Sequence, residues 1–371
     1  MGHRRHFLKK VSAAGIGTAF LTTNLPGKSR SALETVNIAC VGVGGKGSSD
    51  MGETAVNNNI VAICDVDDGR LASAAGRFPK ATKSSDWRKL LEQKDVDAVT
   101  VSTPDHMHGS VSLAAMELNK HVYTQKPLTN TVAESRDLAN MAKKQGLVTQ
   151  MGTQHHSSAR IKNAVELVQG GHIGAVKEVH AWTDRPGNFW KQGLKRPEKS
   201  DPVPANLNWD LWLGVAPKRG FVSELYHPFH WRGWWDFGTG ALGDMGCHIF
   251  DPVFTALKLG APKTVSAKGP APDSDSGPLW CEVTYTFAAT RFAKEDCKVV
   301  WYEAGRLPPR EIINAPKNWQ GSKNGVLFVG ERANVFVGFP EKAELFHEGE
   351  LAGVQMPENS DNNHYQQWTE A

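Results

Sequence analysis

A short apolar segment that runs directly into a cluster of glycines is the feature that most restricts how this 371-residue chain can fold. Residues 36–43 have the composition of a buried β-strand, and Gly42, Gly44 and Gly47 match the pattern G-x-G-x-x-G. A helical stretch, residues 46–57, opens inside the cluster. A strand that ends in a glycine turn and continues as a helix indicates a βαβ unit, and such units build parallel sheets.

An acidic residue after the next strand completes the pattern of a dinucleotide-binding fingerprint. Asp65 stands 18 residues after Gly47, behind a second apolar run. In this fingerprint Gly42 permits a tight turn, Gly44 admits a pyrophosphate, and the helix N-terminus holds the anion. Asp65 would accept from the ribose hydroxyls and repel a 2′-phosphate, so NAD is favoured over NADP, although Arg70 softens that preference. The alternative is a glycine turn that binds no nucleotide.

Strand-like and helix-like segments alternate through the first 150 residues. Such alternation predicts a parallel sheet covered by helices on both faces. Thr131 and Glu134 have the spacing of a capping box before the last of these helices. The predicted strands are residues 36–43, 60–63, 98–102, 122–124 and 148–152, and the predicted helices are residues 46–57, 69–76, 86–93, 106–119 and 132–144.

Polar motifs follow two of these strands, at the sheet edge where ligands of α/β proteins bind. Residues 103–108 read Thr-Pro-Asp-His-Met-His, and residues 125–127 read Gln-Lys-Pro. Lys126 lies at such a strand end and is expected to point into a cofactor cleft. The proline after it supports this interpretation, because it restricts the local backbone. The alternative is an ordinary solvated lysine at the end of a strand.

With these motifs in this order, the sequence resembles the Gfo/Idh/MocA oxidoreductase family from about Val36 onward. The resemblance implies an α/β protein with an N-terminal Rossmann domain, a doubly wound parallel sheet, and a C-terminal α/β domain with an open antiparallel sheet. We place the NAD(P)-binding Rossmann domain at residues 34–153 and a substrate-binding domain at residues 154–371. The family acts mostly on sugars and polyols, so a small-molecule carbohydrate is the expected substrate.

The fingerprint and the resemblance together predict the cofactor site. In the family, the lysine of an E-K-P motif touches substrate and nicotinamide, and Lys126 matches it. Gln125 stands where the family has glutamate, which removes a negative neighbour of that lysine. The predicted cofactor-binding residues are Gly42, Gly44, Gly45, Lys46, Gly47, Asp65, Thr103, Pro104, His108 and Lys126.

A second glycine-rich motif, residues 238–248, looks like the family's entry into a helix that carries D-x-G-x-H. At 100° per residue, Asp244, His248 and Asp251 share one face of this helix. Pro252 cannot donate to the carbonyl of His248, so we expect the helix to bend there or that oxygen to be left free. A carboxylate and an imidazole one turn apart suit proton transfer or metal ligation, whereas the plainer interpretation is a surface ion pair.

Tryptophan is frequent, with 12 residues, and several lie in residues 209–212 and 226–237. Aromatic faces interleaved with polar side chains suit a sugar ring. We expect Trp209 and Trp212 to be packing residues and residues 226–237 to form the rim of a pocket. The predicted substrate-binding residues are Gln154, His155, His230, Trp231, Arg232 and Trp235.

These residues suggest a mechanism with Lys126, Asp244 and His248 as the catalytic set. A sugar hydroxyl would lose its proton to His248, assisted by Asp244, while its carbon-bound hydride passes to nicotinamide. Lys126 would position the hydroxyl and stabilise charge on its oxygen. Histidine suits this role because its ordinary pKa is about 6.5. Which of Lys126 and His248 takes the proton stays open.

The N-terminal residues predict export. Residues 1–31 hold six of the 42 basic residues and no acidic ones, so the remainder has 36 basic against 39 acidic residues and no reason to bind nucleic acid. Arg4 and Arg5 precede a short apolar run that is too short for stable membrane insertion, which resembles a twin-arginine (Tat) signal. We therefore expect the Tat export machinery to be a partner of this protein. The expected location is the periplasm or another exported location. The alternative is a basic tail.

Export leaves two other functions open. Because free NAD is scarce outside the cytoplasm, a redox-neutral NAD-dependent glycosidase or keto-glycoside-forming enzyme is one alternative. A non-catalytic exported sugar-binding protein with a Rossmann fold is the other. The five cysteines do not suggest a disulfide framework, although Cys281 and Cys297 lie in neighbouring strand-like segments. No CxxC or HExxH spacing points to a metal site.

The C-terminal part predicts an antiparallel sheet and a last helix. The strands are residues 265–268, 280–287, 298–302, 326–329 and 334–337. Asn362 and Asn363 are positioned to cap a helix that starts at His364. Members of the family continue well beyond this point, so we expect a C-terminally truncated or partial sequence, and we expect the protein to be a homo-oligomer.

Overall fold

The computed structural model describes residues 35–271, 273–317, 319–347 and 354–371. Residues 36–371 form one compact unit. The export leader predicted for residues 1–31 lies outside the described residues, so it stays a prediction.

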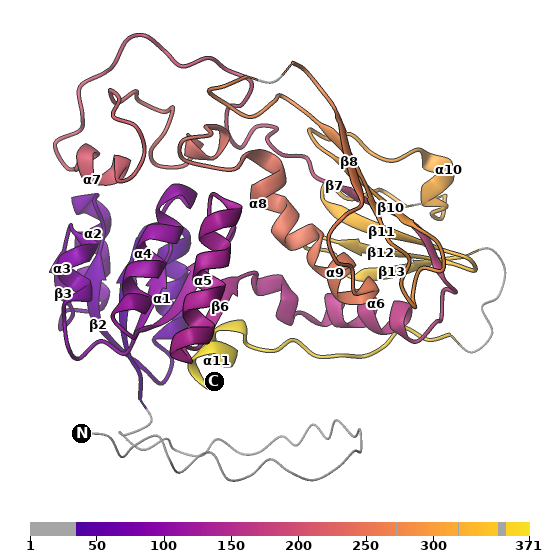
Figure 1. The fold of residues 1–371 in the computed structure, drawn as a ribbon, viewed down its shortest axis with the longest axis horizontal. Helices are drawn as coiled ribbons and strands as arrows, with labels where there is room; N and C mark the ends of the chain where they lie inside the picture. The colour runs from indigo at the N-terminus through magenta and orange to yellow at the C-terminus, as the bar shows by residue number, and fades with distance from the viewer. Residues whose placement is uncertain (1–34, 272, 318, 348–353) are drawn as a thin grey trace. The chain divides into compact units, whose positions relative to one another are not determined.

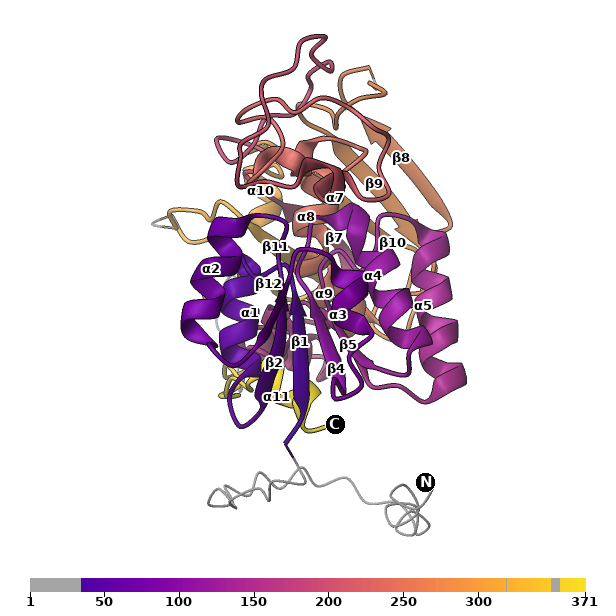
Figure 2. The same ribbon diagram turned by 90° about the vertical axis from the view of Figure 1, so that its left-hand side faces the viewer.

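The first half of this unit is a six-stranded parallel sheet in the order β3-β2-β1-β4-β5-β6 (Figures 1 and 2). β1 lies inside the sheet and pairs with β2 and β4, so the strand order reverses beside it. The predicted doubly wound sheet is confirmed. Its elements are β1 (Asn37–Val41), α1 (Lys46–Thr54), β2 (Asn59–Cys64), α2 (Asp68–Arg77), β3 (Thr82–Ser84), α3 (Trp87–Leu91), β4 (Ala98–Val101), α4 (Asp105–Glu117), β5 (His121–Gln125), α5 (Val132–Gln145) and β6 (Thr149–Gly152).

Helices cover both faces of this sheet. α3, α4 and α5 bury side chains such as Val111 and Leu138 on one face, while α1 and α2 bury Met51 and Ala74 on the other (Figure 2). The predicted capping box is present, since Thr131 and Glu134 exchange side-chain and backbone hydrogen bonds at the start of α5. The alternating pattern of the sequence therefore predicted both the layers and the helix positions.

The second sheet has seven strands in the order β13-β12-β11-β7-β10-β9-β8. β7 and β10 pair in parallel and the other described pairs are antiparallel, so the predicted antiparallel sheet is confirmed with one parallel pair in it. A buried apolar cluster joins this sheet to α6, α8 and α9. The strands are β7 (Val176–Trp182), β8 (Thr264–Lys268), β9 (Glu282–Phe287), β10 (Cys297–Tyr302), β11 (Gly325–Gly330), β12 (Asn334–Gly338) and β13 (Ala343–Phe346), and the helices are η1 (Gln154–Ser157), α6 (Ala159–Gln169), α8 (Gly240–Ile249), α9 (Asp251–Leu257) and α10 (Arg310–Ile313).

Two predicted details of the helices are confirmed. Pro252 stands in the first turn of α9, and the helix expected to bend there is divided into α8 and α9. Asn363 caps α11 (His364–Thr369), where its side chain accepts from the backbone N–H groups of Tyr365 and Gln366. From β13 the chain returns to the Rossmann domain, and α11 lies against it (Figure 1).

The connection between β7 and α8, residues 183–239, is here called the strap. It contains α7 (Trp209–Leu213) and η2 (His230–Gly233) and has its own aromatic core, which includes Trp209, Trp212 and Trp234. Figure 2 shows the strap above the Rossmann sheet. The expectation that Trp209 and Trp212 are packing residues is confirmed, because both are buried in this core.

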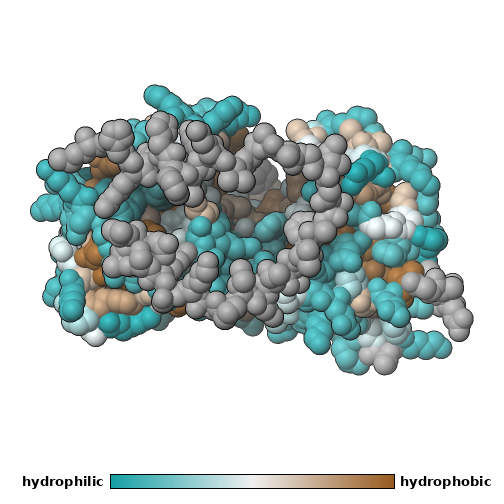
Figure 3. Space-filling model, turned by 90° about the horizontal axis from the view of Figure 1, so that it is seen from below, coloured by the Kyte–Doolittle hydropathy of each residue, from teal (hydrophilic) through white to brown (hydrophobic). Residues whose placement is uncertain are grey.

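Hydrophilic side chains cover much of the face that the described residues present in Figure 3, and hydrophobic ones are scattered over it. Among the described residues, no helix has both the length and the apolar character that crossing a membrane requires. All five cysteines are free, Cys281 and Cys297 included.

Candidate active site

The loop between β1 and α1 has the conformation that its glycines predict. Gly42 adopts φ +78°, in the left-handed region, and its N–H donates to the carbonyl of Cys64. A Cβ atom at Gly47 would overlap the carbonyl oxygen of Gly42, so only glycine lets α1 lie this close to β1. At Gly45 a Cβ would meet nothing within 4 Å, so open space lies over the N-terminus of α1.

Asp65 follows β2 and is turned toward the glycine loop. Its Oδ2 accepts from the N–H groups of Val43 (2.9 Å) and Gly44 (3.2 Å), and its Oδ1 accepts from the N–H of Asp67 (3.0 Å). Arg70 lies over Gly44, where a Cβ would meet its side chain. The two residues expected to decide between NAD and NADP therefore stand together at one end of the site.

A cavity of about 350 Å³ lies between the glycine loop, the carboxyl ends of β1, β4 and β5, α8 and the strap. Its open space above a helix N-terminus and its small residues fit the pyrophosphate of a dinucleotide. Eight of the ten predicted cofactor residues line it, namely Gly42, Gly44, Gly45, Lys46, Asp65, Thr103, Pro104 and Lys126. The strap contributes Leu211, Trp212, His227, Pro228, Phe229, Trp231 and Arg232.

Lys126 and Asp244 meet in this cavity although they lie 118 residues apart. The Lys126 Nζ donates to Oδ1 of Asp244 (2.5 Å) and to its main-chain oxygen (2.9 Å). Arg232 Nε donates to the same Oδ1 (3.2 Å). Burial alone would raise the pKa of Asp244, but the charges of Lys126 and Arg232 hold it at about 2. Asp244 is therefore a permanent anion that fixes two cations.

His248 stands one turn after Asp244 and is 9% exposed. Burial, with Lys126 and His155 beside it, lowers the pKa of His248 to about 3. Its ring packs edge to face on His155 with centroids 5.0 Å apart, and burial lowers the pKa of His155 to about 4. Burial and these neighbours therefore keep the pKa of His248 well below the ordinary histidine value of about 6.5. The residue is a neutral imidazole, and its buried Nδ1 has no hydrogen-bond partner among the described residues.

Asp105 is a site residue that the sequence interpretation missed. It opens α4, lines the cavity, and its Oδ2 accepts from the Thr239 hydroxyl (2.8 Å) at the entry to α8. Burial raises the pKa of Asp105 to about 7, although Lys126 opposes the rise. A carboxyl that changes protonation near neutral pH thus stands among the charged groups. Its place within the motif of residues 103–108 was the signal that could have revealed it.

His108 and Gly47 are the predicted cofactor residues that do not line the cavity. His108 is buried, with Nδ1 at 2.7 Å from the carbonyl oxygen of Pro127 and Nε2 at 2.9 Å from that of Thr103. Burial lowers its pKa to about 4, so the ring is neutral at pH 7. His108 is therefore corrected from a cofactor contact to a residue that packs between two strand-end motifs and helps to place Lys126.

The six predicted substrate residues separate into three groups. Trp231 and Arg232 line the cavity. His155 reaches the site through its ring contact with His248. Gln154, His230 and Trp235 do not line the cavity.

Other contacts occupy those three residues or leave them at the edge of the site. The Gln154 amide donates to the hydroxyl of Tyr123 (2.8 Å). Trp235 is 40% exposed and its indole N–H donates to the carbonyl oxygen of Asp273. His230 lies in η2 beside the two lining residues. A motif that alternates aromatic and polar residues marks a rim, but it does not tell which side chains face inward.

The strap is tied to the Rossmann domain beside the cavity. The backbone of residues 206–208 pairs with residues 66–68, directly after β2. The Asp67 carboxylate accepts from the side-chain amide of Asn206 (3.1 Å), and its Oδ2 lies 3.1 Å from Nε2 of His227. These contacts close the end of the cavity that holds Asp65 and Arg70. Among the described residues, no group of three or more His, Cys, Asp or Glu is arranged to hold a metal ion.

Two models of one family match consecutive parts of the chain. Residues 36–153 match its "Oxidoreductase family, NAD-binding Rossmann fold" and residues 157–318 its "Oxidoreductase family, C-terminal alpha/beta domain". The two matches follow one another along most of the chain. The first covers the parallel sheet, and the second covers β7 to β10 of the second sheet. The chain belongs to the Gfo/Idh/MocA oxidoreductase family.

Curated relatives include dehydrogenases of sugars and polyols. A levoglucosan dehydrogenase of Pseudarthrobacter phenanthrenivorans is 25% identical over 48% of this chain and 38% of its own length. An inositol 2-dehydrogenase of Salmonella typhimurium is 28% identical over 39% and 45%. A glycosyl hydrolase family 109 protein of Solibacter usitatus is 32% identical over 41% and 37%. The matched segments thus span less than half the length of these relatives.

Solved structures share the fold. The WlbA dehydrogenase from Bordetella pertussis, in complex with NADH and UDP-GlcNAcA, has a TM-score of 0.60 at 17% identity over 85% of this chain and 78% of its own. A levoglucosan dehydrogenase in complex with NADH and levoglucosan has a TM-score of 0.59 at 18% identity over 86% and 77%.

Proposed function

We propose that this protein is an NAD-dependent oxidoreductase that acts on a hydroxyl of a sugar, polyol or glycoside and keeps its nicotinamide bound between turnovers. The observation that carries the proposal is the placement of Lys126 and Asp244 at the cavity onto which the glycine loop opens. His248 lies one turn after Asp244 in α8 and does not itself line this cavity. Relatives named as dehydrogenases of levoglucosan and inositol support the substrate class.

The side chains present fit the removal of a proton from a hydroxyl. Bound NAD would supply the hydride acceptor, held by the glycine loop and Asp65. The Lys126 ammonium, fixed by Asp244, donates to the substrate oxygen and stabilises negative charge on it. His248 is neutral and is the candidate acceptor of the proton, although a pKa of about 3 makes its imidazole a weak base. Trp231 offers a face to the sugar ring.

A second candidate follows from the strap. The strap is hydrogen-bonded to residues 66–68 at one end of the cavity, and this closure favours retention of the cofactor. An enzyme that retains its cofactor completes a turnover most simply if it returns the hydride to the substrate. A redox-neutral glycosidase or keto-glycoside-forming enzyme is therefore the alternative. The similarity to a glycosyl hydrolase family 109 protein supports it.

One experiment separates these functions. The purified protein is denatured, the released nucleotide is identified, and the native protein is screened against sugars, polyols and glycosides. Ketosugar formation supports the oxidoreductase, and glycoside cleavage without net NADH supports the alternative. A protein that neither contains nor binds NAD contradicts both and leaves the non-catalytic sugar-binding protein.

Replacing Asp67 with alanine is expected to accelerate NAD release by about tenfold, because the contacts of its carboxylate with Asn206 and His227 of the strap are lost. Turnover at saturating NAD should stay within about threefold. Release is measured by exchange of bound NAD against a labelled excess.

Asp67 also caps α2, so a matched control is needed. Asp86→Ala removes an equivalent N-cap, that of α3, and no described contact ties Asp86 to the strap. Equal release rates in the two variants would show that the strap does not retain the cofactor.

Export through the Tat pathway is part of the proposal, supported by the charge pattern of residues 1–31. Changing Arg4 and Arg5 to lysine together is expected to leave the full-length protein in the cytoplasm, since the pathway reads the arginine pair. Cell fractionation of an epitope-tagged chain measures this. An exported double variant would contradict Tat export, and Lys9→Arg with Lys10→Arg is the control.

A further inference from the structure

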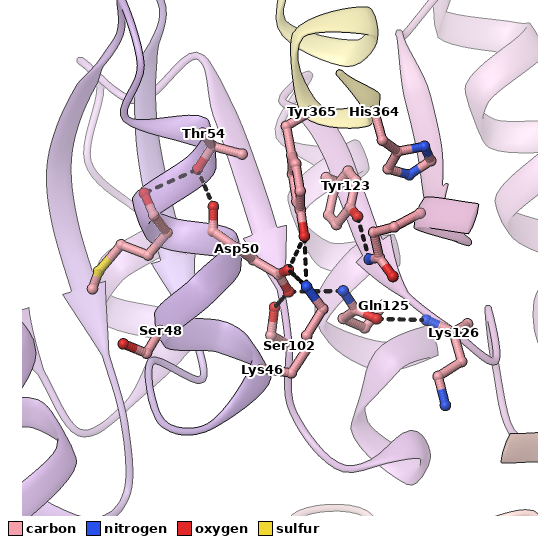
Figure 4. A network of polar contacts seen from close by, with 12 residues as sticks. Lys46, Ser48, Asp50, Thr54, Ser102, Tyr123, Gln125, Lys126, His364 and Tyr365 are labelled. Carbon is pink, nitrogen blue, oxygen red and sulfur yellow. Dashed lines mark hydrogen bonds and ion pairs between the residues drawn. The ribbon is translucent and has the colours of Figure 1, made fainter. Parts of the chain in front are cut away.

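Asp50, in α1, is a fully buried carboxylate that none of the recognised motifs includes. Figure 4 shows it at the centre of a polar network. Its Oδ2 accepts from the Ser102 hydroxyl (2.8 Å) and the Gln125 amide (2.8 Å). Its Oδ1 accepts from the Tyr365 hydroxyl and lies beside the Lys46 ammonium, each at 2.7 Å.

All four partners of Asp50 approach it as donors, on both of its oxygens. A carboxylate suits this environment because both of its oxygens only accept. An asparagine would present its NH₂ group to the donors on one side. Among the described contacts, the Lys46 ammonium is the cation that pairs with this buried charge, and an unpaired buried charge is costly.

The network reaches the lysine site through Gln125. This side chain is 5% exposed and packs against Gly152, where a Cβ would overlap its amide. Because Asp50 takes the Nε2 of this amide, the Oε1 faces the backbone N–H of Lys126 (3.3 Å). Asp50 therefore sets which way the Gln125 amide points, and with it one contact of the Lys126 backbone.

The network also reaches the glycine loop through Lys46. This residue lines the cavity at the start of α1, and its Nζ donates to the Tyr365 hydroxyl (2.6 Å) as well as pairing with Asp50. Tyr365 comes from α11, 315 residues along the chain from Asp50. The Asp50 carboxylate thus holds the Lys46 ammonium beside the glycine loop and the Tyr365 hydroxyl of the C-terminal helix.

We propose that Asp50 is a positioning residue. Its buried carboxylate orients the Gln125 side chain next to Lys126 and holds the Lys46 ammonium at the glycine loop, where the cofactor would bind. This inference rests on the proposed function, since it concerns the same cofactor site. It also explains why a glutamine can stand where the family has glutamate, because Asp50 of α1 supplies the negative charge beside the lysine motif.

A reciprocal exchange of the two side chains tests the proposal. Asp50→Asn is expected to lower NAD affinity and turnover by roughly tenfold or more, because misplacing reacting groups by about 1 Å can cost roughly a hundredfold in rate. Gln125→Glu places a second carboxyl against the first, so the introduced group must keep its proton to donate. The double variant D50N/Q125E restores one carboxylate and one amide and should recover to within about threefold of wild type.

The pH dependence of Gln125→Glu is a readout that a merely structural role would not move. A carboxylate beside it raises the pKa of the introduced carboxyl, so its hydrogen bond to Asp50 is present at low pH and lost as pH rises through that pKa. NAD affinity relative to wild type should therefore fall with rising pH. Tryptophan fluorescence reports NAD binding without turnover, because Trp212 and Trp231 line the cavity.

Thr54→Val is the matched control, since the Thr54 hydroxyl donates to the main-chain oxygen of Asp50 and not to its carboxylate. It should change the melting temperature but not NAD affinity or turnover. An Asp50→Asn protein that binds NAD and turns over like wild type overturns the inference alone, as does a double variant no better than the single ones. A wild-type protein that binds no NAD overturns the proposed function, and the inference falls with it.

Discussion

Replacement of Lys126 by methionine is expected to lower turnover by about a thousandfold while bound nucleotide is retained. Methionine keeps much of the length of the side chain but removes the ammonium that lies in the cavity and donates to Asp244. Proton transfer and charge stabilisation at a positioned group each contribute roughly 10² to 10⁴ in rate. The measurements are steady-state turnover on a responsive sugar and the NAD content of the purified variant.

This variant should still fold. Asp244 keeps Arg232 as a partner when Lys126 is removed, so the buried carboxylate is not left unpaired. Asp244→Asn, by contrast, would leave both cations without their shared anion. Lys143→Met, on the exposed side of α5, is the control for the loss of a lysine. Turnover within tenfold of wild type in Lys126→Met would exclude the lysine from the chemistry.

His248→Ala is expected to lower turnover by about a hundredfold or more with little change in NAD binding. The imidazole is buried one turn after Asp244, burial keeps it neutral, and its Nδ1 has no hydrogen-bond partner among the described residues. His156→Ala is the matched control, because His156 is the next histidine to His155 but is half-exposed and pairs with Asp251. Full activity in His248→Ala would remove this residue from the mechanism.

The pH profile of the wild-type enzyme gives the same hypothesis a second test. Burial lowers the pKa of His248 to about 3, so the ring remains able to accept a proton as pH falls below 6.5. The kcat/KM profile of the wild-type enzyme should therefore contain no fall near pH 6.5 that is due to His248. Any fall in that range should remain in the His248→Ala variant. A fall that this variant abolishes would mean that His248 titrates as an exposed histidine, against its burial.

Much of the Rossmann half was predictable because its signals are local. Strands β1, β2, β4 and β5 and all five helices lie where alternation of apolar segments placed them, to within a few residues. β3 was missed because its three residues are polar and largely exposed. β7 was missed because Glu178 and His180 interrupt its apolar pattern, although the sheet buries His180.

The site was predictable only in part. Lys126, Asp244 and the glycine loop came from motifs, and the cavity contains them. The contacts of Asp67 with the strap and the Asp50 network have no motif of their own, and Asp105 lies in a motif that does not show its partner. Each of these residues depends on a partner that the chain brings in from a distance. His108 carried a motif and yet packs behind the site.

The sequence by itself determined the parallel sheet, the glycine loop after β1 and the motif lysine at the end of β5. Hydrophobic periodicity and the steric freedom of glycine act between near neighbours, so the local order of residues is enough to specify them. Tertiary structure decided which charges meet and how they titrate: Lys126 pairs with Asp244 across 118 residues and Asp50 with Tyr365 across 315. The protonation of His248 belongs to the same class, because burial and neighbouring charge are sums over groups that only the folded chain brings together.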